Sequence, residues 1–231
     1  RGLGDVYKRQ NCMWLKGVVM KAHYNGLIPR NPFIQFHISP NVKEREYLTE
    51  DELKAVMTHE FADSKLAYIR DIFIFASFTA LSFVDIQELT NDNIVEVNGE
   101  KWILSKRHKT KVAFQVKLLD IPLQIVERYR PMQKDNRIFP GLNYWSICKP
   151  LKRMIRECGI TKSISFHCSR HGFATLALSK GMPIESVSRV LGHTNIVTTQ
   201  LYAKITTQKL DNDLTMFGDK LSKTFNGITM S

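Results

Sequence analysis

The sequence predicts an α+β fold that is mostly helical, with one small antiparallel sheet of three strands. Three observations support this prediction. Apolar residues follow helical patterns through most of the chain, but from Asn93 to position 119 the apolar period changes to two. Because that period is confined to one stretch, strands are expected to be segregated from helices and not to alternate with them. Hydrophobic residues make up 43% of the 231 residues, which is enough for a buried core.

The first 42 residues are expected to be separate from the main domain. Residues 11–28 indicate the end of a helix that is closed by Asn25 and Gly26. Residues 29–46 are rich in proline and charge, which is typical of an interdomain connector. Residues 1–10 join no hydrophobic pattern and resemble a translated cloning or sequencing adapter, so the fold prediction leaves them out. The chain is therefore expected to begin inside a domain whose earlier part is absent.

Residues 43–206 are expected to form the main domain. Thr49 and Glu52 make a capping box, which predicts a helix that starts near residue 50. Residues 64–81 are apolar on nearly every face and predict a buried helix. The three strands are predicted at 93–97, 101–106 and 112–119, with Asn98 and Gly99 as the tight turn between the first two.

The helices after the sheet are predicted from their end signals, which are proline in the first turn, a polar N-cap and glycine at the C-terminal end. These signals are Pro122 opening a helix, Gly159 ending the helix over 144–159, Ser165 capping the helix over 167–181, Pro183 opening the helix over 183–192, and Asn195 capping a helix that carries Tyr202. The last region, residues 207–231, is expected to be an amphipathic helix followed by a tail.

The charge of the chain indicates a polyanionic partner. The formal net charge is +11 and the isoelectric point is about 9.5. Nucleic acid is favoured over an acidic membrane surface. No apolar run approaches the length of a membrane span and no secretory leader is evident. The cysteines form no C-x-x-C pair, so free thiols in a reducing cytoplasm are expected; they are Cys12, Cys148, Cys158 and Cys168.

Several polar residues suit phosphate chemistry. His167 and Arg170 are three residues apart on one predicted helix and share a face, where a guanidinium matches the geometry of a phosphate. Alone, such a pair is more often a solvated helix face. His167 and His171 also have the spacing of a zinc helix, but no glutamate lies between them and no third ligand is evident. A metal site is therefore rejected.

The spacing of the polar residues resembles the tyrosine recombinases, the family of phage and conjugative-transposon integrases. A Leu-Gly-His sequence ends at His193, 23 residues after Arg170, and Tyr202 follows nine residues later. Lys109, in the cationic connection KRHKTK between two predicted strands, agrees with the same family. The resemblance runs from about Tyr47 to Tyr202, and the amino-acid sequence around these residues is most similar to integrases of conjugative transposons. It implies that residues 43–206 are a catalytic domain and that residues 1–42 are a remnant of a core-binding domain with its linker.

The resemblance implies a covalent reaction without any cofactor or metal. Tyr202 would attack the scissile phosphorus and leave a 3′-phosphotyrosyl enzyme with a free 5′-hydroxyl. Arg170, His167 and His193 would stabilise the negative charge of the transition state, and His167 would also assist the tyrosine proton. Lys109 would protonate the departing 5′-oxygen.

One position departs from the family pattern. The segment TALSFVD carries Asp85, which matches an acidic position that supports the site, but it has Ser82 where the family has an arginine. A hydroxyl cannot supply that charge. Arg107 is the candidate substitute, because it lies two residues before Lys109 and shares its face if the strand stays extended. The equally weighted alternative is that Arg107 is a solvated charge at the hairpin tip.

The implied partners are double-stranded DNA and further copies of the chain, with a tetramer in the synaptic complex. The implied outcome is integration or excision of a mobile element, and whether a DNA-bending accessory protein takes part is left open. Two alternatives are also consistent with parts of the sequence. Residues 184–202 resemble a helix-turn-helix, as in a DNA-binding regulator without catalysis. A type IB topoisomerase would share the catalytic set.

Overall fold

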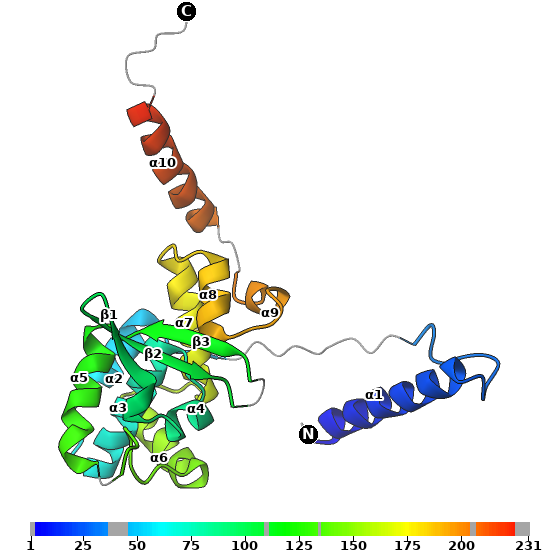
Figure 1. Cartoon of the computed structure of the whole chain (residues 1–231), viewed down its shortest axis with the longest axis horizontal. Helices are drawn as coiled ribbons and strands as arrows, with labels where there is room; N and C mark the ends of the chain where they lie inside the picture. Colours follow the sequence, from blue (N-terminus) through cyan, green and yellow to red (C-terminus); the bar gives the residue numbers. More distant parts are fainter. Residues whose placement is uncertain (1–2, 37–45, 109–110, 134, 204–206, 225–231) are drawn as a thin grey trace, which may run out of the picture. The chain divides into compact units, whose positions relative to one another are not determined.

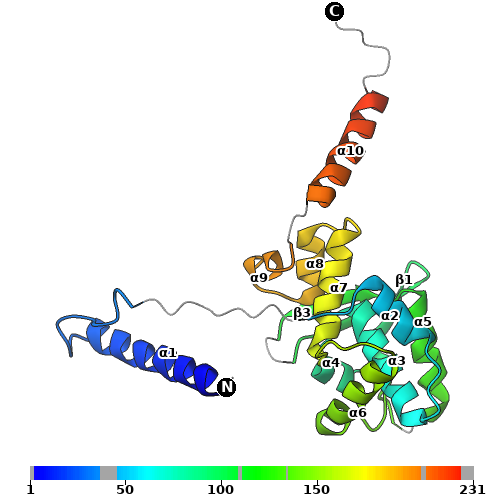
Figure 2. The same ribbon diagram turned by 180° about the vertical axis from the view of Figure 1, so that it is seen from behind.

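The computed structural model describes residues 3–36, 46–108, 111–133, 135–203 and 207–224. The chain divides into two compact units, Arg1–Glu44 and Arg45–Ser231. Figures 1 and 2 show the elements from opposite sides. In chain order they are α1 (Leu3–Tyr24), α2 (Glu50–Thr58), α3 (Ser64–Thr79), α4 (Phe83–Gln87), η1 (Asn91–Asn93), β1 (Ile94–Val97), β2 (Glu100–Lys106), β3 (Ala113–Lys117), α5 (Asp120–Tyr129), η2 (Arg130–Met132), α6 (Tyr144–Glu157), α7 (His167–Ser179), α8 (Ile184–Leu191), α9 (Val197–Gln200) and α10 (Thr207–Thr224).

The first unit contains the predicted helix end. The N–H of Leu27 donates to the carbonyl of Ala22 at 2.9 Å, and Gly26 has a φ of 72°, a conformation that suits glycine. The helix α1 begins at Leu3, so most of the stretch left out of the fold prediction is helical. Residues 37–45 of the predicted connector lie outside the described residues.

The second unit is built around α3. This helix packs against α2, α5, α6 and α7, and its residues include Phe73 and Phe75, which are almost fully buried. Phe75 meets Phe139 edge-on, with ring centroids 4.9 Å apart. The helix ends at Thr79 because Ala80 adopts the left-handed conformation, with a φ of 56°. The prediction of a buried helix over this stretch is confirmed.

The sheet has the predicted three antiparallel strands in the order β1-β2-β3. The turn between β1 and β2 is formed by Asn98 and Gly99, with φ values of 53° and 78°. Ile103 pairs with Val116 across β2 and β3, and both side chains are buried. The strand β3 also contacts α8, which brings the sheet next to the later helices. The mostly helical fold with a small segregated sheet is therefore confirmed.

Two of the predicted helix signals are wrong in detail. The hydroxyl of Ser165 does not cap α7, because it lies 3.3 Å from the sulfur of Cys168 and the residue before the helix is Phe166. Asn195 does accept the N–H of Val197 at 2.9 Å, but the helix that it starts, α9, is only four residues long. Tyr202 lies beyond α9, in a turn.

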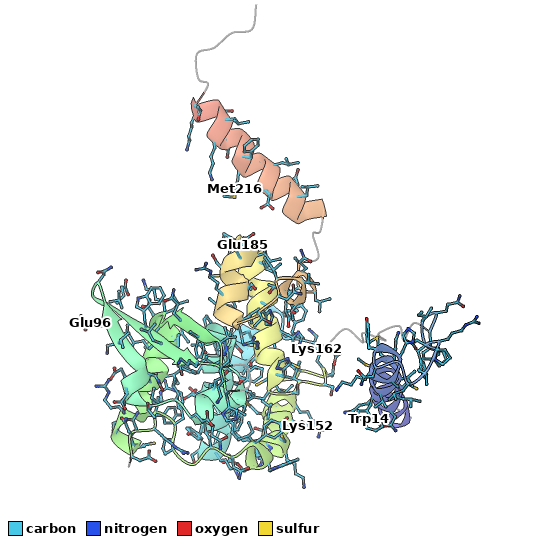
Figure 3. All side chains as sticks on the ribbon, turned by 45° about the vertical axis from the view of Figure 1, so that its right-hand side comes forward. Trp14, Glu96, Lys152, Lys162, Glu185 and Met216 are labelled. Carbon is cyan, nitrogen blue, oxygen red and sulfur yellow. The ribbon has the colours of Figure 1, made fainter. Side chains whose placement is uncertain are left out.

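The helix α10 lies in the last region, where the sequence predicts an amphipathic helix. Its apolar residues recur at helical spacing, and among them Leu214, Met216 and Phe217 are exposed; Met216 is labelled in Figure 3. Within the described residues, no helix combines the length and the apolar character needed to cross a membrane.

Candidate active site

The centre of the site is Arg170, in the first turn of α7. Its guanidinium is buried and donates to the carbonyl of Ala80 at 2.9 Å and to the carbonyl of Leu191. Ala80 follows α3, and Leu191 ends α8. The last carbonyls of a helix lack intrahelical partners and carry the negative end of its dipole, so they are suitable acceptors for a buried cation. Arg170 thus joins the ends of two helices.

Arg107 approaches the same helix end from the sheet. Its guanidinium donates to the carboxylate of Asp85 at 2.7 Å and to the carbonyl of Val190, and it lies over the ring of Phe114 at 4.0 Å. Only 5% of the residue is exposed, so Arg107 is not a solvated charge at a hairpin tip. The two guanidiniums therefore bind consecutive carbonyls at the end of α8.

The predicted shared face of Arg107 and Lys109 depends on a strand that stays extended through both residues. The strand β2 ends at Lys106, before Arg107, and the N–H of Lys111 donates to the carbonyl of Arg107 at 2.8 Å. Lys109 itself lies outside the described residues.

Asp85 organises the residues around Arg107. Its carboxylate also accepts the hydroxyl of Ser82 at 2.7 Å and the backbone N–H of His108 at 3.0 Å. Burial by itself would raise the pKa of Asp85, but the hydrogen bonds from His108, Arg107 and Ser82 together lower it below its usual value. Ser82 is the N-cap of α4, so its hydroxyl is used in a capping box.

His193 lies next to the two arginines. It follows Gly192, the left-handed residue after α8, and its Nδ1 is 2.8 Å from the hydroxyl of Thr199. Burial, and then the charges of Arg170 and Arg107, lower the pKa of His193 to about 4. Burial and the charge of Arg107 likewise lower the pKa of Arg170 to about 10. The site is therefore a region of concentrated positive charge, which favours an anion.

Three aromatic rings form a row beside this region. The ring of His171 is 4.8 Å from that of His167 and 5.0 Å from that of Tyr202, between centroids, and both contacts are tilted edge-to-face. The sequence predicted roles for His167 and Tyr202 but not for His171. The only sequence signal at His171 is its four-residue spacing from His167, which is also the spacing of a zinc helix. Among the described residues, no group of three or more His, Cys, Asp and Glu side chains could hold a metal.

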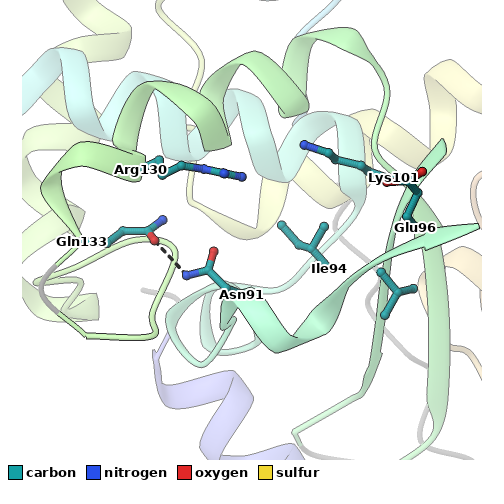
Figure 4. Close-up of a pocket in the computed structure, with 7 residues that line it drawn as sticks. Asn91, Ile94, Glu96, Lys101, Arg130 and Gln133 are labelled. Atoms are coloured by element: carbon teal, nitrogen blue, oxygen red, sulfur yellow. Dashed lines mark hydrogen bonds between the residues drawn. The ribbon is translucent and has the colours of Figure 1, made fainter. Parts of the chain in front are cut away.

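A surface cavity of about 340 Å³ lies elsewhere, beside β1 (Figure 4). It is lined by Asn91, Ile94, Val95, Glu96, Lys101, Arg130 and Gln133. None of these is a predicted site residue.

Gly192 offers a first test of the arginine geometry. A methyl group added there would lie 2.8 Å from Nε and 3.0 Å from Cγ of Arg107, at a φ of 60° that side chains rarely adopt. We expect Gly192→Ala to displace Arg107 and to slow the DNA cleavage that the family resemblance implies about tenfold or more, because small misplacements in a reacting site are costly. The measurement is single-turnover cleavage together with urea unfolding.

Gly181→Ala is the matched control for that substitution. Gly181 has a φ of 89° with no atom within 4 Å of the added methyl group, so only backbone strain is introduced. Both variants are expected to lose about 1 kcal/mol of stability from strain. Equal cleavage rates in the two variants would contradict the importance of the Arg107 contact.

The pKa of His193 predicts a pH dependence of stability. The folded-state pKa, about 4, is below the ordinary value, so the unfolded chain binds the proton more readily. The stabilising contribution of neutral His193 is therefore complete above about pH 6.5 and is lost as the pH falls towards 4. Urea unfolding at several pH values should show a smaller loss in His193→Gln than in the original chain. The same pH dependence in both proteins would contradict this assignment.

Comparison with known proteins supports the resemblance to the tyrosine recombinases. The sequence profile described as "Phage integrase family" matches residues 46–209. Tyrosine recombinase XerA of Pyrococcus horikoshii is 32% identical over 177 residues, which are 71% of this chain and 58% of the relative. Tyrosine recombinase XerD of Listeria innocua is 26% identical over 204 residues, 81% of this chain and 67% of the relative. The chain thus spans 58% of the length of the Pyrococcus recombinase.

The fold is similar to that of solved structures. The Tn1549 transposon integrase, solved in complex with a circular intermediate DNA, superposes with a TM-score of 0.73 at 18% sequence identity. The match covers 87% of this chain and 76% of that one. At this identity the likeness shows the fold alone.

Proposed function

The chain belongs to the phage integrase family of tyrosine recombinases, and from this we propose that it cuts and rejoins DNA strands at specific sites through a 3′-phosphotyrosyl intermediate. The observation that carries the proposal is the convergence of Arg170, Arg107 and His193 at the end of α8, next to the row of rings that ends at Tyr202. The purpose would be the integration or excision of a mobile element.

Arg170 and Arg107 would form the phosphate clamp. The transition state of phosphoryl transfer spreads negative charge over the phosphoryl oxygens, and fixed cations stabilise that charge without having to reorganise. Both guanidiniums are buried in this site, so their interaction with an anion is only weakly screened by water. Arg107 would supply the charge that Ser82 cannot. Asp85 would hold the Arg107 side chain through their 2.7 Å contact.

Tyr202 would be the nucleophile. Its oxygen would form a bond to phosphorus while the bond to the 5′-oxygen of DNA breaks, and the reverse reaction would rejoin the strand without ATP. A phenol with a pKa of about 10 is mostly protonated at neutral pH and needs a base or a strong cationic field. His167 would assist the tyrosine proton, and Lys109 would donate a proton to the leaving 5′-oxygen. His193, neutral at pH 7 before DNA binds, would donate a hydrogen bond to the phosphate.

The partners follow from the reaction. Double-stranded DNA would be the substrate, and the net charge of +11 suits it. Two duplexes cut in both strands would need several subunits, so we propose a homo-oligomer on DNA, a tetramer in the synaptic complex. The cytoplasm is the proposed location.

The test uses DNA from the ends of the element that encodes the chain. A nicked substrate that loses its 5′-hydroxyl fragment after cleavage should trap a covalent protein–DNA adduct, which a denaturing gel detects. Joining of two labelled duplexes would identify a recombinase, whereas relaxation of a supercoiled plasmid without joining would indicate a type IB topoisomerase. Binding of the DNA without any adduct would indicate a regulator and would contradict the proposal.

A further inference from the structure

His171 lies between two residues of the proposed reaction. It is on α7, one turn after His167, and its ring contacts the rings of both His167 and Tyr202. The planes are inclined by 82° to His167 and by 66° to Tyr202. Such edge-to-face arrangements are preferred by aromatic pairs and depend on orientation. His171 is therefore placed to influence the direction in which the Tyr202 ring points.

The backbone alone holds Tyr202 weakly. The helix α9 has four residues and ends before Tyr202, whose N–H donates to the carbonyl of Thr199 at 3.0 Å in a single turn. The side chain is half-buried and packs at the border of a small apolar cluster that contains Ala174 and Leu191. This packing limits the position of the ring, but apolar contacts do not specify its tilt.

Resting on the proposed function, we propose that His171 is a positioning residue whose ring holds the Tyr202 ring in the orientation needed for attack. The attacking oxygen of a phenol lies in line with its ring axis, so the direction of the ring sets the direction of the oxygen. In-line displacement at phosphorus demands that direction. α7 also carries Arg170, so one helix would align the nucleophile with the phosphate clamp.

The first experiment compares three replacements in single-turnover adduct formation. We expect His171→Ala and His171→Gln to slow cleavage about tenfold to a hundredfold, because an oriented aromatic contact is lost and a misplacement of about 1 Å can cost about 10²-fold. His171→Phe keeps the ring and should restore most of the rate. The affinity for DNA should be the same in all three, since Tyr202 would act after binding.

Thr175→Ala is the matched control. Thr175 lies on the next turn of α7 and its hydroxyl donates to the backbone carbonyl of His171 at 3.1 Å, a bond that does not use the imidazole ring. This variant disturbs the helix locally and should keep the original rate. If His171→Phe is as slow as His171→Ala, the polar atoms of the imidazole matter more than the ring, and the proposal is overturned.

A second experiment does not depend on activity. 3-Fluorotyrosine is placed at position 202, and its fluorine resonance is recorded in the DNA-free protein. We expect one resonance in the original chain and in His171→Phe, and a shifted or broadened resonance in His171→Ala. An unchanged resonance in His171→Ala would overturn the positioning role. Failure of the original chain to form any adduct, with the expected resonances observed, would instead contradict the proposed function.

Discussion

Tyr202→Phe is expected to abolish covalent adduct formation and leave folding and DNA binding intact. The substitution removes a single hydroxyl group, whose oxygen is the atom proposed to bond to phosphorus. The ring itself remains, so its edge-to-face contact with His171 and its packing beside the small apolar cluster are retained. A denaturing gel with trapped nicked DNA measures the adduct, and gel shift measures the binding.

Tyr144→Phe is the control for a lost tyrosine hydroxyl. Tyr144 is the first residue of α6 and meets Phe83 edge-on with ring centroids 5.4 Å apart, and it belongs to no part of the proposed site. We expect it to form adduct at the original rate. If Tyr202→Phe still forms the adduct, Tyr202 is not the nucleophile. If Tyr144→Phe forms no adduct while Tyr202→Phe does, the nucleophile has likewise been assigned wrongly.

Arg107→Ala is expected to lower the cleavage rate about 10²–10³-fold, the usual cost of removing one donor that stabilises transition-state charge. Arg170→Ala should be at least as severe. The buried position of Arg107, 5% exposed, adds a structural effect: its loss leaves the Asp85 carboxylate without its cation. Removing one partner of a buried ion pair costs about 3–5 kcal/mol. Urea unfolding must therefore accompany the kinetics, at a temperature where every variant is folded.

Two further variants separate the effect of losing the Arg107 charge from the effect of losing folding stability. Arg128 also donates to a buried carboxylate, that of Asp71, at 2.7 Å, and belongs to no part of the site. Arg128→Ala should lose stability and keep its cleavage rate once folded. Ser82→Arg, added to Arg107→Ala, should restore part of the rate, because position 82 lies beside Asp85 and would return a guanidinium to the space left by Arg107. Unchanged cleavage in Arg107→Ala would show that Arg107 does not replace the arginine that the family has at the position of Ser82.

Much of the fold could be predicted because its signals are local. The change of apolar period at Asn93 identified the sheet, and Asn98 with Gly99 identified its turn, since both need only neighbouring residues. The candidate site depended on residue spacing alone. Residue spacing does not give the distances between side chains in the folded protein. The convergence of Arg170 and His193 at the end of α8 could not be predicted from it, because it depends on tertiary packing.

Other features could not be read from the sequence. The burial of Arg107 depends on the position where β2 ends and on the contact of β3 with α8, neither of which has a local signal. Helix propensity alone did not show that α9 stops before Tyr202, where bonds between residues three apart close a turn. The spacing of His171 and His167 is that of a metal-binding helix, whereas the contact of His171 with Tyr202 depends on the path of the chain after α9, which has no local signal.

The two bonds of Arg170 have a consequence for synthesis on the ribosome. Its acceptors, the carbonyls of Ala80 and Leu191, lie 90 residues before it and 21 residues after it. A growing chain therefore cannot assemble the clamp until Leu191 has emerged, and Tyr202 emerges later still. A copy that stops before Leu191 would lack an acceptor of the proposed clamp, and one that stops before Tyr202 would lack the proposed nucleophile. On the proposed function, a chain still being synthesised could therefore not cut DNA before both segments had emerged and folded.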